Sequence, residues 1–268
     1  YVTDNKGELV GAMSIRDLLF APDKSLVKDE MDSDIVSVKT SDDQEEAIKA
    51  FQKYDFSKIP VVDERNKLIG MITSDDVIDA IEDEATEDIH KMAGITPVET
   101  PYLETSALKI ALSRIPWLLV LMLSATLSGA ILTKNEKLLL LIPALSIFEP
   151  MLMDTAGNAG SQSASMVIRG IVVDNLNMKD FFKIFWKELC VAIVCGIVLF
   201  IVNMIRIYAF MSGTDMMVGL VSSITVVVVV ICAKLVGGLL PLIANHFNLD
   251  PAVLASPLIT TIVDCVSL

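Results

Sequence analysis

One ionisable residue, an aspartate, lies within a strongly apolar segment of this chain. Asp264 lies in the apolar run 251–268, and Ser256 and Thr260 precede it at intervals of four residues. In a helix, that spacing places the three oxygen-bearing side chains on one face. An ionisable residue inside a membrane span is costly and is treated as functional by default, so this face favours a transport function. The alternative is a buried aspartate that is satisfied by helix hydroxyl groups.

A second polar stretch, residues 154–165, interrupts another apolar segment. If it is helical, Asp154, Asn158 and Gln162 share one face at intervals of four residues. The glycines and alanines among them permit close approach of a neighbouring helix. Helix packing alone explains the small residues, but it does not explain the two amide side chains.

Eight acidic residues and no basic residue lie between positions 75 and 88. They are Asp75, Asp76, Asp79, Glu82, Asp83, Glu84, Glu87 and Asp88. Several repeat at intervals of three and four, so like charges would repel one another along a helix. Dense carboxylates suit a hard divalent cation, which prefers oxygen ligands. A solvated acidic helix face is the alternative interpretation.

Charge and hydropathy divide the chain into two parts that must position these groups. The chain has 268 residues, a net charge of −13 and a mean hydropathy of +0.59. Residues 1–106 hold 25 of the 34 acidic residues and 11 of the 21 basic ones, whereas the remainder is nearly neutral and apolar. A single soluble domain is thereby excluded, and an acidic half is a poor candidate for binding nucleic acid.

Several kinds of site are not expected. All four cysteines lie in the apolar part, so neither a disulfide framework nor a structural zinc site is expected. No set of nucleophile and base and no glycine-rich phosphate loop is visible, so an enzyme is not expected. The chain starts at Tyr1 without a signal peptide, and it is expected to be a fragment of a longer protein.

The apolar part predicts five membrane-spanning helices, each needing about 20 mostly apolar residues. The predicted spans are residues 115–132, 138–173, 184–210, 216–244 and 251–268. The second would be ~54 Å long as one helix, which is too long for an ordinary span. Basic residues between positions 169 and 187 place that connection in the cytoplasm, which leaves residues 1–114 cytoplasmic as well.

The acidic part contains an internal repeat with a shift of 59 residues. Residues 1–21 and residues 60–80 each have the pattern of a strand, a polar turn, a strand with glycine and a Ser/Thr-x-x-Asp sequence. That last sequence fits a helix N-cap. Between the copies, residues 44–53 predict a helix and residues 58–62 predict a strand.

This pattern resembles a pair of cystathionine-beta-synthase (CBS) domains. The second domain, residues 27–80, is nearly whole and includes Ile59-Pro-Val-Val-Asp63 and Leu68-Ile-Gly-Met-Ile-Thr73. The first keeps only its last strands and helix, within residues 1–26. The resemblance implies a regulatory module that binds an adenine nucleotide such as ATP.

The resemblance also implies which residues would bind that nucleotide. The ribose-binding aspartate of such domains maps onto Asp17 and Asp76. Arg16 is free to meet a phosphate, whereas Asp75 at the equivalent position would repel it. Arg16 and Asp17 are therefore the favoured nucleotide-binding pair, and capping alone is the alternative role for both aspartates.

The membrane part resembles the MgtE family of magnesium channels. The resemblance lies in Pro150 followed by Gly157-Asn-Ala-Gly-Ser-Gln-Ser163, and in Asp250-Pro251-Ala252 followed by Asp264. Residues 84–94 are similar to the family's link between CBS domains and membrane. Three residues depart from the family pattern: Ala156 replaces a glycine, Asp154 replaces a small residue, and Glu149 is an added acid.

The resemblance implies a homodimeric Mg²⁺ channel in the cell (inner) membrane, with the pore on the twofold axis between five-helix protomers and the CBS domains in the cytoplasm. Asp264 and its symmetry mate would select the ion, and would hold hydrated Mg²⁺ through water. The expected pore lining is Asn158, Gln162, Ser256, Thr260 and Thr261. Cytoplasmic Mg²⁺ would close the pore by binding the acidic segment, at Asp76, Asp79, Asp83, Glu84, Glu87 and Asp88.

The expected fold is therefore multi-domain. An α/β CBS module is followed by an acidic connecting helix and linker, residues 81–112, and by an all-α transmembrane domain, residues 113–268. Two other functions stay open: a coupled carrier for another divalent metal, and a membrane-anchored, nucleotide-sensing CBS regulator without transport. The polar residues within the spans argue against the second, because an anchor does not need them. The sequence does not separate Mg²⁺ from Mn²⁺ or Co²⁺.

Overall fold

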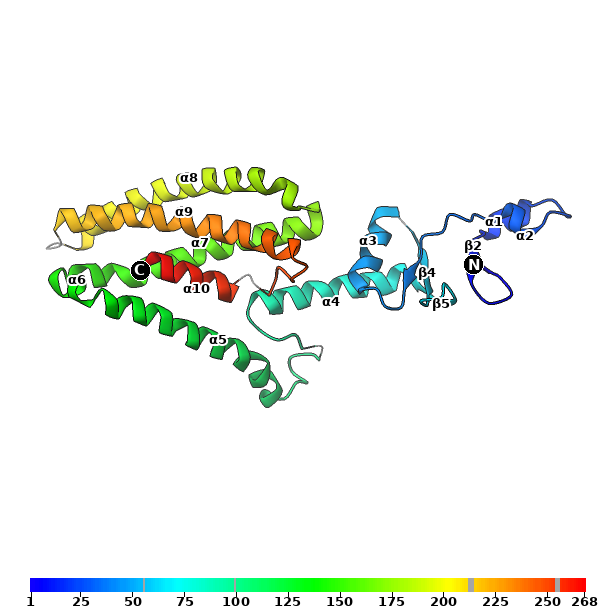
Figure 1. Ribbon diagram of the computed structural model, residues 1–268, viewed down its shortest axis with the longest axis horizontal. Coiled ribbons are helices and arrows are strands. Elements are labelled where there is room, and N and C mark those ends of the chain that lie inside the picture. The colour runs from blue at the N-terminus through cyan, green and yellow to red at the C-terminus, as the bar shows by residue number, and fades with distance from the viewer. Residues whose placement is uncertain (55, 99, 212–214, 254–255) are drawn as a thin grey trace. The chain divides into compact units, whose positions relative to one another are not determined.

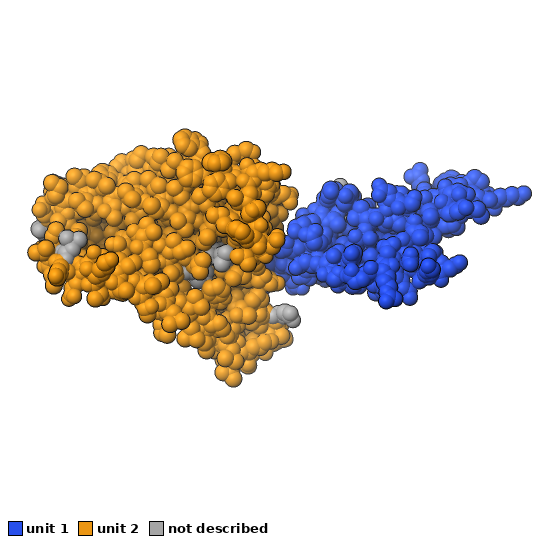
Figure 2. Space-filling view, in the orientation of Figure 1, with its two compact units in different colours: residues 1–86 blue, residues 87–268 orange. Residues whose placement is uncertain are grey.

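The structure is a computed structural model of the chain. It describes all residues except 55, 99, 212–214 and 254–255, and it also leaves the side chains of residues 138, 256 and 257 undescribed. The described residues form two compact units, residues 1–86 and residues 87–268 (Figure 2).

The first unit is α/β, as predicted. Its elements are β1 (Val2–Thr3), β2 (Leu9–Gly11), α1 (Ile15–Phe20), α2 (Val27–Glu30), β3 (Val38–Lys39), α3 (Gln44–Tyr54), β4 (Lys58–Val62), β5 (Leu68–Thr73) and the larger part of α4 (Ser74–Met92). β1 and β2 form an antiparallel pair. The second sheet has the order β3-β4-β5, with β4 parallel to β3 and antiparallel to β5. The helix and the strand predicted between the two repeats are both confirmed.

The internal repeat is visible as two turns of the same geometry. The carboxylates of Asp4 and Asp63 each accept backbone N–H groups from the residues two and four places further on, at 2.8–2.9 Å. These backbone hydrogen bonds hold the pKa of both carboxyl groups below the ordinary value. The left-handed position of each turn is Gly7 (φ 83°) and Asn66 (φ 60°), which are residue types that tolerate it.

The core of the first unit lies between the three-stranded sheet and its helices. Ile59 of β4 is fully buried and packs with Val38 of β3 and with one apolar face of α3. Val77, in the first turn of α4, closes the same cluster. The sheet therefore fixes the position at which the acidic helix begins.

The second unit is all-α. Its elements after the end of α4 are α5 (Ala107–Lys134), α6 (Glu136–Leu141), α7 (Ala144–Asp174), η1 (Met178–Asp180), α8 (Phe181–Phe210), α9 (Met216–His246) and α10 (Ser256–Ser267). Among the described residues, three helical segments are long and apolar enough to cross a membrane: Ala107–Lys134, Met178–Phe210 and Met216–His246. α7 is as long as these, but polar residues occupy its centre.

Two predicted spans have different bounds in the structure. The predicted span 138–173 is divided at Pro143 into α6 and α7, because proline disfavours a helical conformation in the residue before it. The predicted span 251–268 is the shorter helix α10, which residues 251–253 precede as a turn. Pro150 lies within α7 without ending it.

The core of the second unit is built around close contacts of α7. A Cβ atom on Gly237 of α9 would lie 2.1 Å from the carbonyl oxygen of Gly160 of α7. A Cβ atom on Gly160 would lie 2.7 Å from Cγ2 of Ile259 of α10. Only glycine permits this approach at either position. α10 contacts α5, α7 and α9, and Figure 1 shows it lying alongside α7.

Candidate functional site

A cavity of about 310 Å³ lies between α7 and α10. It is lined by Met153, Asp154, Gly157, Asn158, Ser161, Thr260 and Asp264. The carboxylate, amide and hydroxyl oxygens in this set are the ligands that a hard divalent cation prefers. We call this cavity the α7–α10 pocket.

Helix periodicity and a glycine bring these side chains together. The α7 residues that line the pocket are spaced three and four apart, and the two polar α10 residues are four apart, so each helix contributes one face. A Cβ atom on Gly157 would lie 3.3 Å from Cγ2 of Thr260, so the missing side chain lets α10 approach α7. Nδ2 of Asn158 donates to Oδ1 of Asp154 at 3.2 Å, which orients the carboxylate beside the amide.

The predicted pore residues divide into those inside and those outside the pocket. Asp264, Asn158 and Thr260 line it. Gln162 is exposed and is not among the lining residues. Thr261 faces α5 instead, where its Oγ1 donates to Oγ of Ser124 at 3.0 Å. The side chain of the fifth residue, at position 256, lies outside the described part of the chain.

Ser161 and Asp154 line the α7–α10 pocket, but neither was among the pore-lining residues expected from the sequence. Four-residue spacing from Asn158 selects Gln162, whereas three-residue spacing selects Ser161, and both spacings occur on one helix face. The position of α10 decides between them. Gly157, four residues before Ser161, is the sequence signal that could have shown which face of α7 contacts α10.

The acidic segment is helical, as predicted, and capping explains the motif aspartate of each repeat, Asp76 and Asp17. The carboxylate of Asp76 accepts the hydroxyl of Thr73 at 2.6 Å and its backbone N–H at 2.8 Å. The carboxylate of Asp17 forms the equivalent capping box with Ser14. Side-chain hydrogen bonds from these hydroxyl groups lower the pKa of both carboxyl groups below the ordinary value.

The expected regulatory acids lie along α4 in different environments. Asp76, Asp79 and Asp83 are exposed, while Glu84, Glu87 and Asp88 are partly buried. Oε1 of Glu84 accepts from Nε2 of Gln44 of α3 at 2.5 Å. In the part of the chain that the structure describes, no three Asp, Glu, His or Cys side chains converge as metal ligands.

A lysine joins the last turn of α4 to the approach to α10. Nζ of Lys91 lies 2.5 Å from Oε1 of Glu87 and 2.7 Å from Oδ2 of Asp250. The other oxygen of Asp250 accepts the backbone N–H of Ala252 at 2.8 Å, so this aspartate caps the turn before α10. Burial alone would lower the pKa of Lys91, but the hydrogen bonds that its ammonium group donates to Asp250 and Glu87 outweigh it and raise that pKa. Only one feature of the sequence indicates part of this bridge, namely the four-residue spacing of Glu87 and Lys91.

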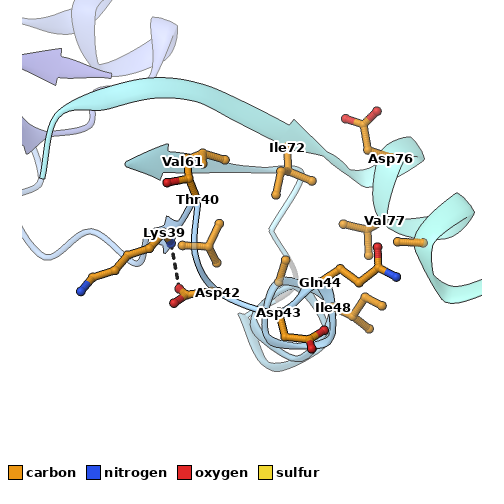
Figure 3. Close-up of a pocket in the computed structure, with 13 residues that line it drawn as sticks. Lys39, Thr40, Asp42, Asp43, Gln44, Ile48, Val61, Ile72, Asp76 and Val77 are labelled. Carbon is orange, nitrogen blue, oxygen red and sulfur yellow. Dashed lines mark hydrogen bonds between the residues drawn. The ribbon is translucent and has the colours of Figure 1, made fainter. Parts of the chain in front are cut away.

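A second cavity, also of about 310 Å³, lies in the first unit between the sheet, α3 and the start of α4 (Figure 3). Its apolar side includes Val38, Ile48, Val61, Ile72 and Val77, and its polar side is Lys39, Thr40, Asp42, Asp43, Gln44 and Asp76. Arg16 and Asp17, the favoured nucleotide-binding pair, lie instead on α1, all of whose residues are exposed. The pocket therefore belongs to the second repeat rather than to the first.

Comparison with known proteins gives a match in each half of the chain. Residues 149–268 match the model of the MgtE family, described as a divalent cation transporter, and residues 27–83 match the CBS domain. The magnesium transporters MgtE of Thermus thermophilus and of Bacillus subtilis are 36% and 34% identical over 268 residues. Both matches cover all of this chain but only 59% and 58% of those proteins, so the chain spans less than two thirds of their length.

Solved structures that are similar over part of the chain include one with a bound nucleotide. It is the cytosolic domain of the Mg²⁺ channel MgtE in complex with ATP, which is 45% identical with a TM-score of 0.29. The similarity covers 30% of this chain and 32% of that one.

Proposed function

We propose that this chain, whose residues 149–268 match the MgtE family of divalent cation transporters, conducts Mg²⁺ across a membrane through the α7–α10 pocket. The observation that supports this most strongly is that Asp154 and Asp264, from two different helices, line one pocket with amide and hydroxyl groups. A membrane anchor needs no such set of oxygen ligands, because polar groups within a span are costly.

The size and chemistry of the pocket suit a hydrated ion. Mg²⁺ dehydrates reluctantly and usually keeps several of its waters. Six waters at ~30 Å³ each occupy roughly 180 Å³, which is less than the volume of the pocket. We propose that Asp264 attracts the ion through its waters, while Asn158, Ser161 and Thr260 accept or donate hydrogen bonds to those waters.

We propose that the working channel is a homodimer embedded in the lipid of the cell (inner) membrane, with the CBS module in the cytoplasm. Asp154 and Asn158 line the pocket yet are exposed in the single chain. A second copy facing this side would add its own carboxylates to the same path. Two carboxylates on opposite sides of a hydrated divalent ion are a suitable selective site.

We also propose that cytoplasmic Mg²⁺ closes the channel through α4. Its exposed acids repel one another, and a bound divalent cation would relieve that repulsion and favour the closed arrangement. The ion pairs of Lys91 with Glu87 and Asp250 give this helix a direct connection to the turn that leads into α10. A change in α4 would thereby reach the helix that bears Asp264.

An adenine nucleotide is proposed as a modulator of the first unit, at the pocket that Asp76 lines rather than at Arg16 and Asp17. The apolar side of that pocket suits a purine base, and Asp76 could accept ribose hydroxyl groups. The carboxylates of Asp42 and Asp43 would repel phosphates. Binding of ATP itself is therefore expected to be weak.

Ion flux into liposomes tests the proposed function. The full chain is reconstituted and Mg²⁺ entry is recorded with a fluorescent indicator, with Mn²⁺ and Co²⁺ as competitors and with an imposed voltage step. We expect Mg²⁺ entry whose rate follows the voltage without a counter-ion. Entry that requires a second ion gradient would identify a coupled carrier, and absence of any divalent flux would favour the membrane-anchored regulator.

A further inference from the structure

A cation and an acid that the proposed conduction path does not use meet within the helical unit. Lys234 of α9 is only 5% exposed, and its Nζ donates to Oγ of Ser163 of α7 at 3.4 Å. Ser163 is 2% exposed and donates in turn to Oε2 of Glu188 of α8 at 2.6 Å. One buried hydroxyl group therefore connects an ammonium group and a carboxylate across three helices.

The three residues lie well inside the helices that contain them. Glu188 is about 10 Å from the first residue of α8, and Lys234 is about 18 Å from the last residue of α9, at 1.5 Å per residue. Neighbouring glycines of α9 make the packing close: a Cβ atom on Gly238 would lie 2.8 Å from Cγ of Glu188. Such packing limits the water that could solvate either charge.

Each of these two charges requires a compensating group. A lone charge in a low-dielectric interior is strongly unfavourable, whereas a compensated pair is tolerated. Among the residues that the structure describes, neither Lys234 nor Glu188 forms a direct ion pair within 4.0 Å, with each other or with a third residue. Ser163 is the hydrogen-bond partner that the two share.

The pair lies behind one side of the α7–α10 pocket. Ser163 is two residues after Ser161, which lines the pocket. A Cβ atom on Gly160 would be 3.3 Å from the carbonyl oxygen of Ala233, the residue before Lys234, and 2.7 Å from Ile259 of α10. α9 also contacts α10 directly, so an uncancelled charge on Lys234 would act on a divalent ion in the pocket across closely packed protein.

We propose that Glu188 is the counter-charge of Lys234, and that this serine-bridged pair keeps the α9 side of the cation pocket electrically neutral. The inference rests on the proposed function, because it concerns the ion in that pocket. Without Glu188, the remaining cation would repel Mg²⁺. Without Lys234, the remaining anion would attract it.

The opposite signs of these effects give a test that damage to the fold cannot imitate. Glu188→Gln, Lys234→Met and the double variant are reconstituted, and the Mg²⁺ concentration that gives half-maximal flux is measured. We expect a rise of roughly threefold or more for Glu188→Gln, a fall of similar size for Lys234→Met, and a value near wild type for the double variant. The matched control is Lys187→Met, which removes an exposed lysine next to Glu188 and should change nothing.

A second measurement does not depend on transport. Thermal unfolding in detergent should show a lower Tm for each single variant and recovery in the double variant, because removing one partner leaves the buried Lys234 or the partly buried Glu188 uncompensated. If Glu188→Gln does not fold at all, the double variant should still fold. The proposal would be overturned if the Mg²⁺ concentration for half-maximal flux shifted in the same direction in both single variants or did not shift. Additive loss of stability in the double variant would also overturn it. A wild-type protein without divalent flux would instead contradict the proposed function and leave the stability test valid.

Discussion

Nζ of Lys91 lies 2.7 Å from Oδ2 of Asp250, and this ion pair joins the last turn of the acidic helix to the turn that precedes α10. Both side chains are partly buried, at 22% and 36% exposure, and Lys91 also pairs with Glu87. A surface ion pair usually contributes little, but a partly buried pair that also caps a turn couples the two segments more firmly.

Lys91→Met should weaken the response of the channel to cytoplasmic Mg²⁺ without changing conduction. The variant removes the connection from α4 to Asp250, while the α7–α10 pocket stays intact. In inside-out patches we expect the Mg²⁺ concentration for half-inhibition to shift by about threefold or more, with unitary current unchanged. Lys49→Met, which removes an exposed ion-paired lysine from α3, is the matched control. An unchanged inhibition curve in Lys91→Met would exclude this bridge from gating.

The stabilising contribution of the ion pairs between Lys91 and the carboxylates of Glu87 and Asp250 should not depend on pH over the physiological range. The pKa of Lys91 is raised in the folded protein, so its stabilising contribution is fully present below the ordinary lysine value of about 10.4. The contribution is lost only as the pH rises through the higher folded value. The difference in Tm between wild type and Lys91→Met should therefore stay constant from about pH 6 to pH 9. A difference that disappears within this range would show that Lys91 is not held as a charged partner.

Neutralising one face of α4 should remove the Mg²⁺ response. The combined variant Asp76→Asn, Asp79→Asn, Asp83→Asn and Glu87→Gln removes stacked like charges and oxygen ligands together. In inside-out patches we expect an open probability that no longer follows cytoplasmic Mg²⁺, with the channel held closed and the unitary current nearly unchanged. The amide oxygen of an asparagine at position 76 can still accept the backbone N–H of Thr73, so the helix should survive. An intact Mg²⁺ dose response would place the sensor outside α4.

Asp76 should stabilise the first unit in a pH-dependent way. Hydrogen bonds from Thr73 lower the pKa of its carboxyl group, so the stabilising contribution is present above the unfolded value of about 3.9. It is lost as the pH falls through the lower folded value. Asp76→Ala should therefore lower Tm at pH 7, and the difference from wild type should shrink as the pH falls below about 4. A difference that is independent of pH would mean that the carboxylate does not act as the cap.

The first unit should prefer adenosine or a monophosphate to ATP. Two aspartates on the polar side of the pocket, Asp42 and Asp43, would repel additional phosphates. Calorimetry on the full chain should give weak or undetectable binding of ATP, and Arg16→Ala should not change it. If ATP bound tightly and Arg16→Ala abolished that binding, the nucleotide site would lie in the first repeat instead.

Local patterns in the sequence predicted elements better than they predicted contacts. The strand at residues 58–62 has the predicted bounds, because apolar alternation and the following polar turn both act locally. Pro143 divides the second span, and this is again a local effect. The contact between Lys91 and Asp250 and the buried bridge at Ser163 join residues far apart in the chain, and no periodicity indicates them. The choice of Ser161 over Gln162 likewise depends on where α10 packs.

Flux through variants of the pocket acid tests conduction through the α7–α10 pocket most directly. Asp264→Asn removes one of the two carboxylate charges of the pocket with little change of shape, and Gln162→Ala alters an exposed polar residue of α7 as its matched control. Mg²⁺ entry into liposomes is measured for both variants after dimer assembly is verified by light scattering. We expect Asp264→Asn to abolish Mg²⁺ entry and Gln162→Ala to preserve it. Wild-type entry in assembled Asp264→Asn protein would contradict conduction through this pocket.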